Sequence, residues 1–429
     1  MSLSHADTAS EKVSNALALQ FNWFKTIHTV GGYSGPVVSF RSNSLRFTGP
    51  GNDWRLEGLI KGSIELFKKT QNFEWLDIIE RDVTGFLSAQ RNDGTFENSY
   101  FEWNPFEGGM PHEPAVLAVC LQANQVLEQY DRSITGLEEI VQRYLDDVLT
   151  ERLWNKSMGF VRDWEISDFQ YTNAASCAAM LELINVLAEI NGDRRRYSYF
   201  ADALAQTLVG LQIEGGYLDG AVVSSNRRGA GASPFLASRC LRALRLHANL
   251  VKSSSISEAA DRLKTFLVRQ ALPEGGFKRM LWTWRPHSIN PIVTGASAQV
   301  LTALLEDGFN DDPFYKLQEN WLLSLQLPTG AFRNAIGHGQ LTPNVDKSEW
   351  RDWIPSAGWQ DKIFYFLALR GASSPSNEWA SKEWETRTRV KGAWGEYIEN
   401  PEEIKVLRKG VLFYHWKKRK RMASVCKLS

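Results

Sequence analysis

Two short stretches decide the fold of this chain: QRNDGTF at Gln90–Phe96 and QLPTGAF at Gln326–Phe332. Both place a glutamine four residues before a glycine and an aromatic residue two after it. Gly–aromatic turns recur in steps of 64, 57, 60 and 55 residues, ending at Phe96, Phe160, Tyr217, Phe277 and Phe332. Tyr33, 63 residues before Phe96, ends a sixth turn. A period of about 60 residues indicates a repeat architecture.

Two kinds of helical segment alternate between these turns. One kind is apolar nearly all round, which is typical of buried helices. Its six members begin near Asn52, Pro111, Tyr171, Ser233, Pro291 and Ser356. The other kind, such as EWLDIIERDVTGFLSAQ at 74–90, has apolar residues at i, i+3 and i+4 and charges elsewhere, as in an outer layer. Six of each predict an all-α fold, an (α/α)6 barrel whose inner ring is wrapped by an outer ring.

The connections between the helices differ in length. Links from an inner to an outer helix are short, whereas those from an outer to an inner helix are long, and the last spans 327–355. Loops of that length in a compact domain are usually functional. All the long loops open over the N-termini of the inner helices, so we expect the active or binding site at this mouth. We expect one toroid domain at 10–375 and a C-terminal extension with a basic tail at 376–429.

Composition limits the partners. Lys plus Arg and Asp plus Glu both total 49, and this balance argues against nucleic acid or an anionic membrane as a whole-surface partner. The run WKKRKR at 416–421 is expected to be a solvated tail, with contact to anionic lipid as the alternative. No secretory signal and no uninterrupted run of 18 apolar residues is visible, so we expect a cytoplasmic protein, at most peripheral to a membrane. Cys120, Cys177 and Cys240 are expected to be buried small hydrophobes in a reducing compartment.

Tryptophan is the unusual residue, because many of the 16 fall in the long loops instead of helical stripes. Wide, rigid aromatic faces suit a deep cavity that holds a large apolar or sugar-like ligand. The residues that we expect to line this cavity are Trp103, Tyr171, Asn173, Trp282, Trp284, Arg285, Trp350, Trp353 and Trp359. The arginine among them would hold a carboxylate or phosphate at the rim, or remain a solvated loop charge.

The two complete turns resemble the repeat of the squalene–hopene and oxidosqualene cyclases. The resemblance covers one toroid, where those cyclases carry two, and it points to the terpenoid-cyclase and protein-prenyltransferase superfamily. It implies protonation-initiated (class II) cyclisation of a linear terpenoid or meroterpenoid, with no metal and no cofactor. The D-x-D-D of those cyclases and the D-D-x-x-D of metal-dependent synthases are both absent. The Asp pairs at 146–147 and 311–312 are expected to be surface carboxylates.

His112 and Glu113 occupy the last two carboxylate positions of the cyclase motif, at the start of an inner helix. A glutamate buried at an apolar mouth can have its pKa raised enough to hold a proton. The alternative for the pair is a helix N-cap with the histidine on solvent.

The longest loop gives a second set of acids. Asp346 and Asp352 lie there among tryptophans, and either is a candidate for the general acid, oriented by His112 or Glu113. A surface ion pair with Arg351 is the alternative for Asp352. Asp53 and Asp361, beside the first and last inner helices, are weaker candidates and are expected to act as caps or ion-pair partners.

Three functions are open at this point. Terpenoid cyclisation is the leading one, because the starts of the inner helices are apolar. The alternative is a carbohydrate-active (α/α)6 enzyme, a glycoside hydrolase or polysaccharide lyase, with Glu113 and Asp346 or Asp352 as its acid/base pair. That reading predicts a more polar cavity, rich in Asn, Gln and Asp. The third is a toroid without catalysis that binds lipid or protein.

Overall fold

The computed structural model describes residues 8–29, 32–39, 44–48, 53–97, 110–162, 171–282, 291–337, 350–371, 388–392, 395–408 and 410–418. Six helices form a closed inner ring, in which each contacts the next and the last contacts the first. These are α2 (Trp54–Thr70), α4 (His112–Glu128), α6 (Ala174–Asn191), α8 (Pro234–Val251), α10 (Thr294–Glu306) and α13 (Ala357–Arg370). All six begin within a few residues of the expected starts.

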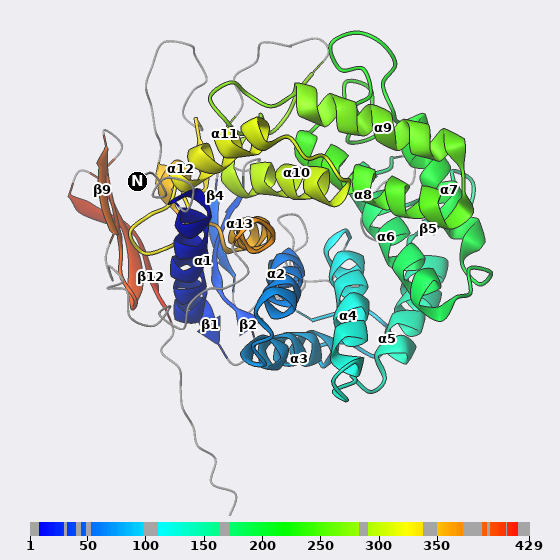
Figure 1. Ribbon diagram of the computed structural model, residues 1–429, viewed down its shortest axis with the longest axis horizontal. Helices are drawn as coiled ribbons and strands as arrows, with labels where there is room; N and C mark the ends of the chain where they lie inside the picture. Colours follow the sequence, from blue (N-terminus) through cyan, green and yellow to red (C-terminus); the bar gives the residue numbers. More distant parts are fainter. Residues whose placement is uncertain are drawn as a thin grey trace, which may run out of the picture.

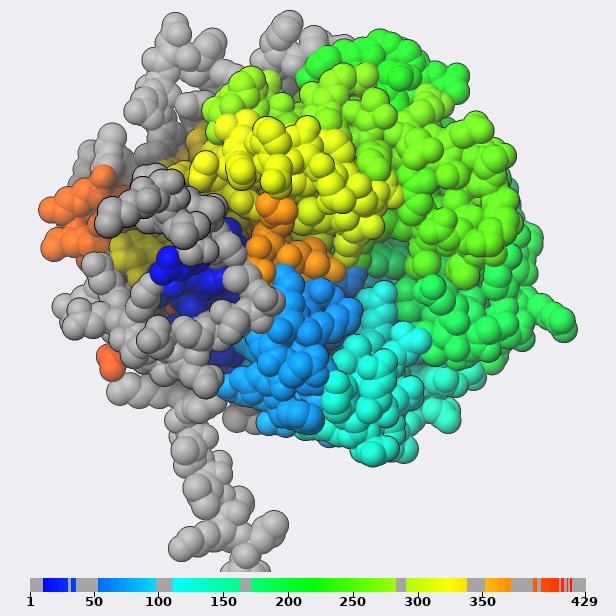
Figure 2. Space-filling view, in the orientation of Figure 1, coloured from blue at the N-terminus to red at the C-terminus, as the bar shows by residue number. Residues whose placement is uncertain are grey.

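The outer ring wraps around this inner ring (Figure 1). Its members are α1 (Thr8–Ile27), α3 (Glu74–Leu87), α5 (Leu137–Arg143) continued by the π-helix η1 (Tyr144–Leu153), α7 (Ser198–Gly210), α9 (Ser254–Arg269) and α11 (Asp312–Leu323). The segments follow one another around the molecule in chain order, as the surface colours in Figure 2 show. The expected (α/α)6 barrel is therefore confirmed.

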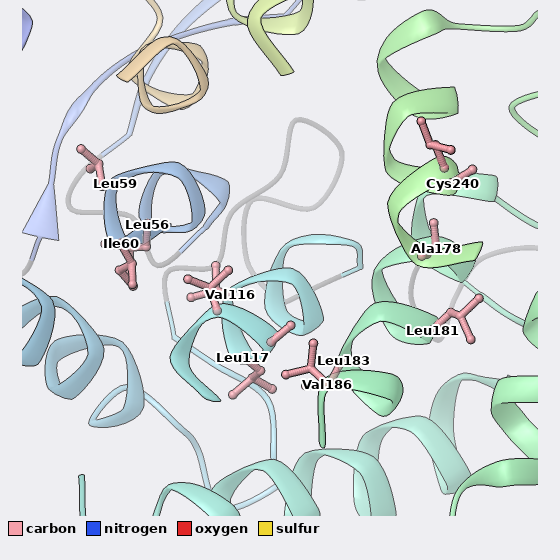
Figure 3. Packing of buried hydrophobic residues seen from close by; sticks show 14 of the residues in the cluster. Leu56, Leu59, Ile60, Val116, Leu117, Ala178, Leu181, Leu183, Val186 and Cys240 are labelled. Atoms are coloured by element: carbon pink, nitrogen blue, oxygen red, sulfur yellow. The ribbon is translucent and has the colours of Figure 1, made fainter. Parts of the chain in front are cut away.

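Aliphatic side chains fill the spaces between these helices. Val116 and Leu117 of α4 and Leu183 and Val186 of α6 belong to one large buried cluster (Figure 3). By length and composition α6 is apolar enough to cross a membrane, but 83% of it is buried inside the barrel. It is therefore a core helix of the inner ring.

The glutamine of the repeated turn joins neighbouring outer helices. The Gln90 side-chain amide donates to the carbonyl of Gly94 in its own turn and to that of Ile140 in α5, both at 3.1 Å. Gln326 does the same with Gly330 and with Ala16 of α1, at 2.9 and 2.8 Å. The motif thus ties the end of one outer helix to the next, which explains why it recurs with the repeat.

The third turn corrects one assignment. Gln212 donates to the carbonyls of Gly220 and of Ala259 in α9, and it bridges to Val222 as Gln90 bridges to Phe96. Val222 is fully buried, whereas Tyr217 is 50% exposed. The turn is five residues longer than its sequence indicated, and a valine takes the place that we assigned to Tyr217.

Helices α2 and α13 approach closely because α2 carries glycine at positions 58 and 62. A Cβ on Gly58 would lie 2.4 Å from the backbone oxygen of Asp361, far inside van der Waals contact. We expect Gly58→Ala to lower the free energy of unfolding by about 1–3 kcal/mol, the usual cost of overpacking. Gly85→Ala is the control, since nothing lies within 4 Å of its Cβ on the exposed face of α3. It should stabilise by about 0.5–1 kcal/mol in urea denaturation, and equal effects at the two sites would contradict the packing argument.

Four short two-stranded antiparallel sheets lie in the connections of the described part of the chain. They are β1 (His28–Thr29) with β2 (Gly32–Tyr33), β3 (Gly35–Ser39) with β4 (Ser44–Thr48), β5 (Trp154–Asn155) with β6 (Phe160–Val161), and β7 (Ile292–Val293) with β8 (Ala335–Ile336). Helix α12 (Trp350–Trp353) lies within the longest loop and contacts β8.

The C-terminal extension forms a four-stranded antiparallel sheet beside α1, which the sequence did not indicate (Figure 1). Its strands are β9 (Thr388–Gly392), β10 (Gly395–Glu399), β11 (Glu403–Arg408) and β12 (Val411–Lys417). Part of the expected solvated tail belongs to this sheet, because Lys418 is buried and pairs with Glu399 at 2.7 Å. Glu399 also accepts from the Trp23 indole at 2.8 Å, and this bond joins the extension to α1 of the toroid.

Candidate active site along the barrel axis

The mouth at the N-termini of the inner helices has an apolar floor. The rings of Trp54 and Phe235 meet edge to face with centroids 5.5 Å apart, and Phe235 meets Trp359 at 4.9 Å. All six inner helices and two strands contribute to this cluster, whose other members are Ala115, Ala179, Leu236, Val293, Ala296 and Ala335. The described part of this mouth thus presents aromatic and aliphatic surface.

His112 and Glu113 are held by structural contacts. A Glu113 carboxylate oxygen accepts the Phe96 amide at 3.0 Å, and its side chain is hydrogen-bonded to the Tyr144 hydroxyl. Nδ1 of His112 accepts the Trp54 amide at 3.2 Å, so this nitrogen carries no proton. Burial lowers the pKa of His112 to about 3, which keeps the ring neutral. Both residues are buried, and these contacts join the turn and the neighbouring helices.

The remaining predicted residues are scattered. Four of them lie outside the described residues: Asp346, Trp103, Trp284 and Arg285. The backbone of Trp350 is described as part of α12, but its side chain is not. Asp352 is fully buried in α12, and Trp353 beside it stacks under the Arg333 guanidinium at 3.6 Å.

Three other predicted residues lie at or near the mouth. Asn173 caps α6 by accepting the Ala175 amide, and Tyr171 lies half-buried under Arg227. Trp282 is half-buried, and its ring lies so close to Gly231 that a Cβ at this position would meet it. Of the weaker candidates, Asp53 is the N-cap of α2, as expected.

Below the aromatic floor, eight charged residues occupy the barrel axis. We call them the axial cluster: Glu57, Lys61, Glu182, Arg239, Arg242, Glu306, Asp361 and Lys362. Four are acids and four are bases, and the ion pairs among them join all eight. Charged groups buried this deeply persist only when they are paired. The cluster lies between the aromatic floor at the mouth and the opposite end of the barrel.

Glu57 is the centre of the cluster. Its carboxylate lies 2.5 Å from Arg239, 2.8 Å from Lys362 and 3.5 Å from Arg242. Burial alone would raise the pKa of Glu57, but these cations outweigh burial and hold it well below its usual range. Glu57 is therefore ionised throughout the physiological range.

The other two buried acids have the opposite behaviour. Burial raises the pKa of Glu182 to about 8, with the negative charges of Glu57 and Glu306 adding to the effect. Burial also raises the pKa of Asp361 to about 7, against the opposing charge of Lys362. One Asp361 oxygen, Oδ2, accepts from the Gly58 amide at 3.0 Å and from Lys362 at 2.9 Å. The other, Oδ1, is buried and makes no hydrogen bond within the described residues.

Sequence reasoning missed most of this cluster. A signal was present, because Glu57 and Lys61 are four residues apart and Arg239 and Arg242 three apart, on helices that are otherwise apolar. Charges at helical spacing in a buried helix must face partners on other helices. Which partners they face depends on ring closure, which brings residues 57 and 362 together.

A cavity of about 760 Å³ opens at the other end of the barrel. Its walls come mainly from the C-terminal halves of inner helices, opposite to the mouth where we expected the site. The lining is largely polar: Gln122, Gln125, Gln129 and Asn249, with the charged residues Lys61, Glu65, Lys68, Glu128, Glu182, Arg242, Arg245, Glu306 and Asp307. In the part of the chain that the structure describes, no three His, Cys, Asp or Glu side chains gather to hold a metal ion.

The raised pKa of Glu182 makes the free energy of unfolding depend on pH. Between its ordinary pKa in the unfolded chain, about 4.5, and its raised folded value, the folded state binds more protons, so stability falls as pH rises. We expect Glu182→Gln to flatten the decline between pH 5 and 8 by up to about 1.4 kcal/mol per pH unit. Urea denaturation across this range measures the slope. Glu189→Gln, an exposed change on the same helix, is the control, and equal slopes for both variants would contradict the expectation.

No family model matches the chain, and no curated protein matches it. Solved structures share the fold at low identity. A D-mannose isomerase has a TM-score of 0.57 at 14% identity, over 86% of this chain and 98% of that one. The α-1,6-mannanase GH76A of Salegentibacter sp. HEL1_6 has 0.55 at 14%, over 84% and 99%. The type II terpene cyclase MstE from Scytonema has 0.50 at 13%, over 84% and 97%. These similarities establish the (α/α)6 toroid.

Proposed function

We propose that this protein is a carbohydrate-active enzyme that uses a carboxylate acid/base pair, the reading that sequence analysis kept as its alternative. One observation carries the proposal: the barrel axis below the aromatic floor holds eight charged side chains that are paired with one another. A migrating terpenoid cation needs an apolar, aromatic-lined interior. Among the described residues, an aromatic cluster lies at the mouth and charged side chains occupy the interior below it.

Asp361 and Glu57 are the acid/base pair that we propose, below the mouth where the long loops begin. Both accept from the same Lys362 ammonium, at 2.9 and 2.8 Å, yet their pKa values move in opposite directions. Asp361 holds a proton near neutral pH, and Glu57 is ionised. Such a split suits a general acid and a base or nucleophile. The shared lysine also keeps the carboxylates close, as in retaining glycosidases.

The comparisons support this choice of chemistry. Most of the similar solved structures are named for carbohydrates, including the D-mannose isomerase, the mannanase and two unsaturated glucuronyl hydrolases. Terpenoid cyclisation is the second candidate. The aromatic cluster of Trp54, Phe235 and Trp359 favours it, as does the similarity to one terpene cyclase.

The test is a substrate panel. The protein is incubated with neutral and uronate-containing oligosaccharides and, separately, with linear polyprenyl and prenylated-aromatic compounds, and products are followed by mass spectrometry. We expect cleaved sugars with retained anomeric configuration. Cyclic terpenoids without any sugar product would overturn the proposal.

Two matched variants then test the acid. Asp361→Asn should lower turnover at least a hundredfold while thermal unfolding shows a folded protein. Asp147→Asn, an exposed change on the outer ring, should leave it unaltered. Full activity in a folded Asp361→Asn protein would remove Asp361 from the mechanism.

A further inference from the structure

The cavity at the C-terminal end of the inner ring lies apart from the proposed catalytic pair. Neither Glu57 nor Asp361 lines it, although Glu182 of the axial cluster does. Its volume of about 760 Å³ falls within the ~300–1,000 Å³ range of small-molecule sites. Nothing in the proposed reaction uses it.

The charged groups around this cavity are already paired with one another. Lys68 lies 2.8 Å from Glu65, and Arg245 lies 2.6 Å from Asp307. Arg242 is held between Glu182 and Glu306 at 2.7 and 2.8 Å. An anionic or cationic ligand would therefore have to break an existing pair to gain one. The pairing favours an uncharged ligand.

The amide groups around the cavity are not engaged in this way. Within the described residues, no hydrogen bond is formed by the side chains of Gln122, Gln125, Gln129 and Asn249. Gln122 and Gln125 are on α4 and Gln129 is its C-cap residue, and helical spacing places the three along one face. Each amide offers two donors and an acceptor to a ligand.

Glu182 provides a polar group at the inner side of the same cavity. Its side chain is 6% exposed, and its Oε2 atom makes no hydrogen bond within the described residues, although Arg239 is 3.7 Å away. A buried oxygen without a hydrogen bond costs free energy, which a bound hydroxyl group would recover. The phenol ring of Tyr365 and the aliphatic chains of Ile64, Leu241 and Leu246 supply apolar wall between these polar groups.

We propose that this cavity is a second carbohydrate-binding site, which takes an uncharged oligosaccharide through the amide groups of α4 and the carboxyl group of Glu182. Amides that bond hydroxyl groups, with aliphatic and phenolic patches beside them, match the alternating polar and apolar surface of a sugar. The ligand class rests on the proposed function, whereas the position of the site rests on the cavity alone. The site lies at the opposite end of the barrel from the mouth, and Lys61 and Arg242 stand between it and Glu57.

Calorimetric titration in the Asp361→Asn background tests this site, because turnover then consumes no ligand. The probes are the uncharged mannotriose, cellotriose and maltotriose, with a uronate trisaccharide and inorganic phosphate for comparison. We expect at least one uncharged trisaccharide to bind, and Gln122→Leu with Gln125→Leu to weaken that binding at least tenfold. Gln125→Ala, a milder change at the exposed rim, should weaken it in the same direction. Gln206→Leu on the outer helix α7 is the matched control and should leave it unaltered.

The outcomes separate the two proposals. Binding that is lost only in the cavity variants supports the second site, whether or not the unmodified protein turns sugars over. Undiminished binding in folded cavity variants overturns it. So does binding of only the uronate or phosphate, or the absence of any sugar binding. Failure of the proposed function shows separately, as the absence of sugar products from the unmodified protein.

Discussion

Replacing Arg239 with methionine should lower the free energy of unfolding by about 3–5 kcal/mol, a large fraction of the ~5–15 kcal/mol that holds a typical domain folded. The guanidinium is fully buried, 2.5 Å from Glu57 and 3.7 Å from Glu182. Methionine fills a similar volume but removes the nearest cation from the Glu57 carboxylate, which stays ionised and away from water. The cost comes from the uncompensated buried charge.

The variant should also become more sensitive to pH. Protonation of one carboxyl group would restore the balance of charge, so the loss should be smaller at pH 5 than at pH 8. Urea denaturation at both pH values measures it. Adding Glu57→Gln should recover part of the loss, because the double variant again has equal numbers of acids and bases.

A surface ion pair of the same length is the control. Arg196 lies 2.5 Å from Asp146, but both side chains are about half exposed. Arg196→Met should cost about 1 kcal/mol or less, as exposed pairs do. Similar losses from Arg196→Met and Arg239→Met would show that the axial cluster contributes no more than a surface contact.

The (α/α)6 fold could be predicted from the sequence because its structural unit repeats. Gln90 and Gln326 make the same two hydrogen bonds in turns 236 residues apart, so each local pattern reports one unit of the ring. The prediction failed where a unit departs from the repeat. The turn after Gln212 is longer, so its glycine and buried residue lie at 220 and 222 instead of at 216 and 217.

The site was harder to predict than the fold, because its chemistry depends on contacts between distant helices. Asp361 was expected to be a cap or ion-pair partner, and its pair with Lys362 agrees with that. Its raised pKa also depends on burial and on Glu57, which is 304 positions away in the chain. Glu113 had the right position for a catalytic acid, but the Phe96 amide and the Tyr144 hydroxyl bind its carboxyl group. Spacing along the chain shows which residues reach the interior, and the packed ring decides their partners.

Replacing Lys418 with methionine should cost about 3–5 kcal/mol, although this residue belongs to a basic run that reads as a tail. Its ammonium is the only cation on Glu399 within the described residues, at 2.7 Å, and both side chains are almost fully buried. The Glu399 carboxylate also accepts from the Trp23 indole, the Thr329 hydroxyl and the Tyr397 hydroxyl, so it links the sheet to α1 and to the turn after α11. Without the lysine, an ionised carboxylate would remain buried at this junction.

The dependence on pH identifies the cause of that loss. Burial would raise the pKa of Glu399, but Lys418 and the hydrogen bonds outweigh burial and lower it. The stabilisation is therefore present at neutral pH and is lost as pH falls and Glu399 takes up a proton. The cost of Lys418→Met should accordingly be largest near pH 7 and shrink toward pH 4, measured by urea denaturation. Faster hydrogen exchange in β10 and β11 would show that the sheet separates from the toroid. Lys417→Met changes the exposed neighbouring residue and should alter neither quantity; equal losses for the two lysines would mean that the run is a solvated tail after all.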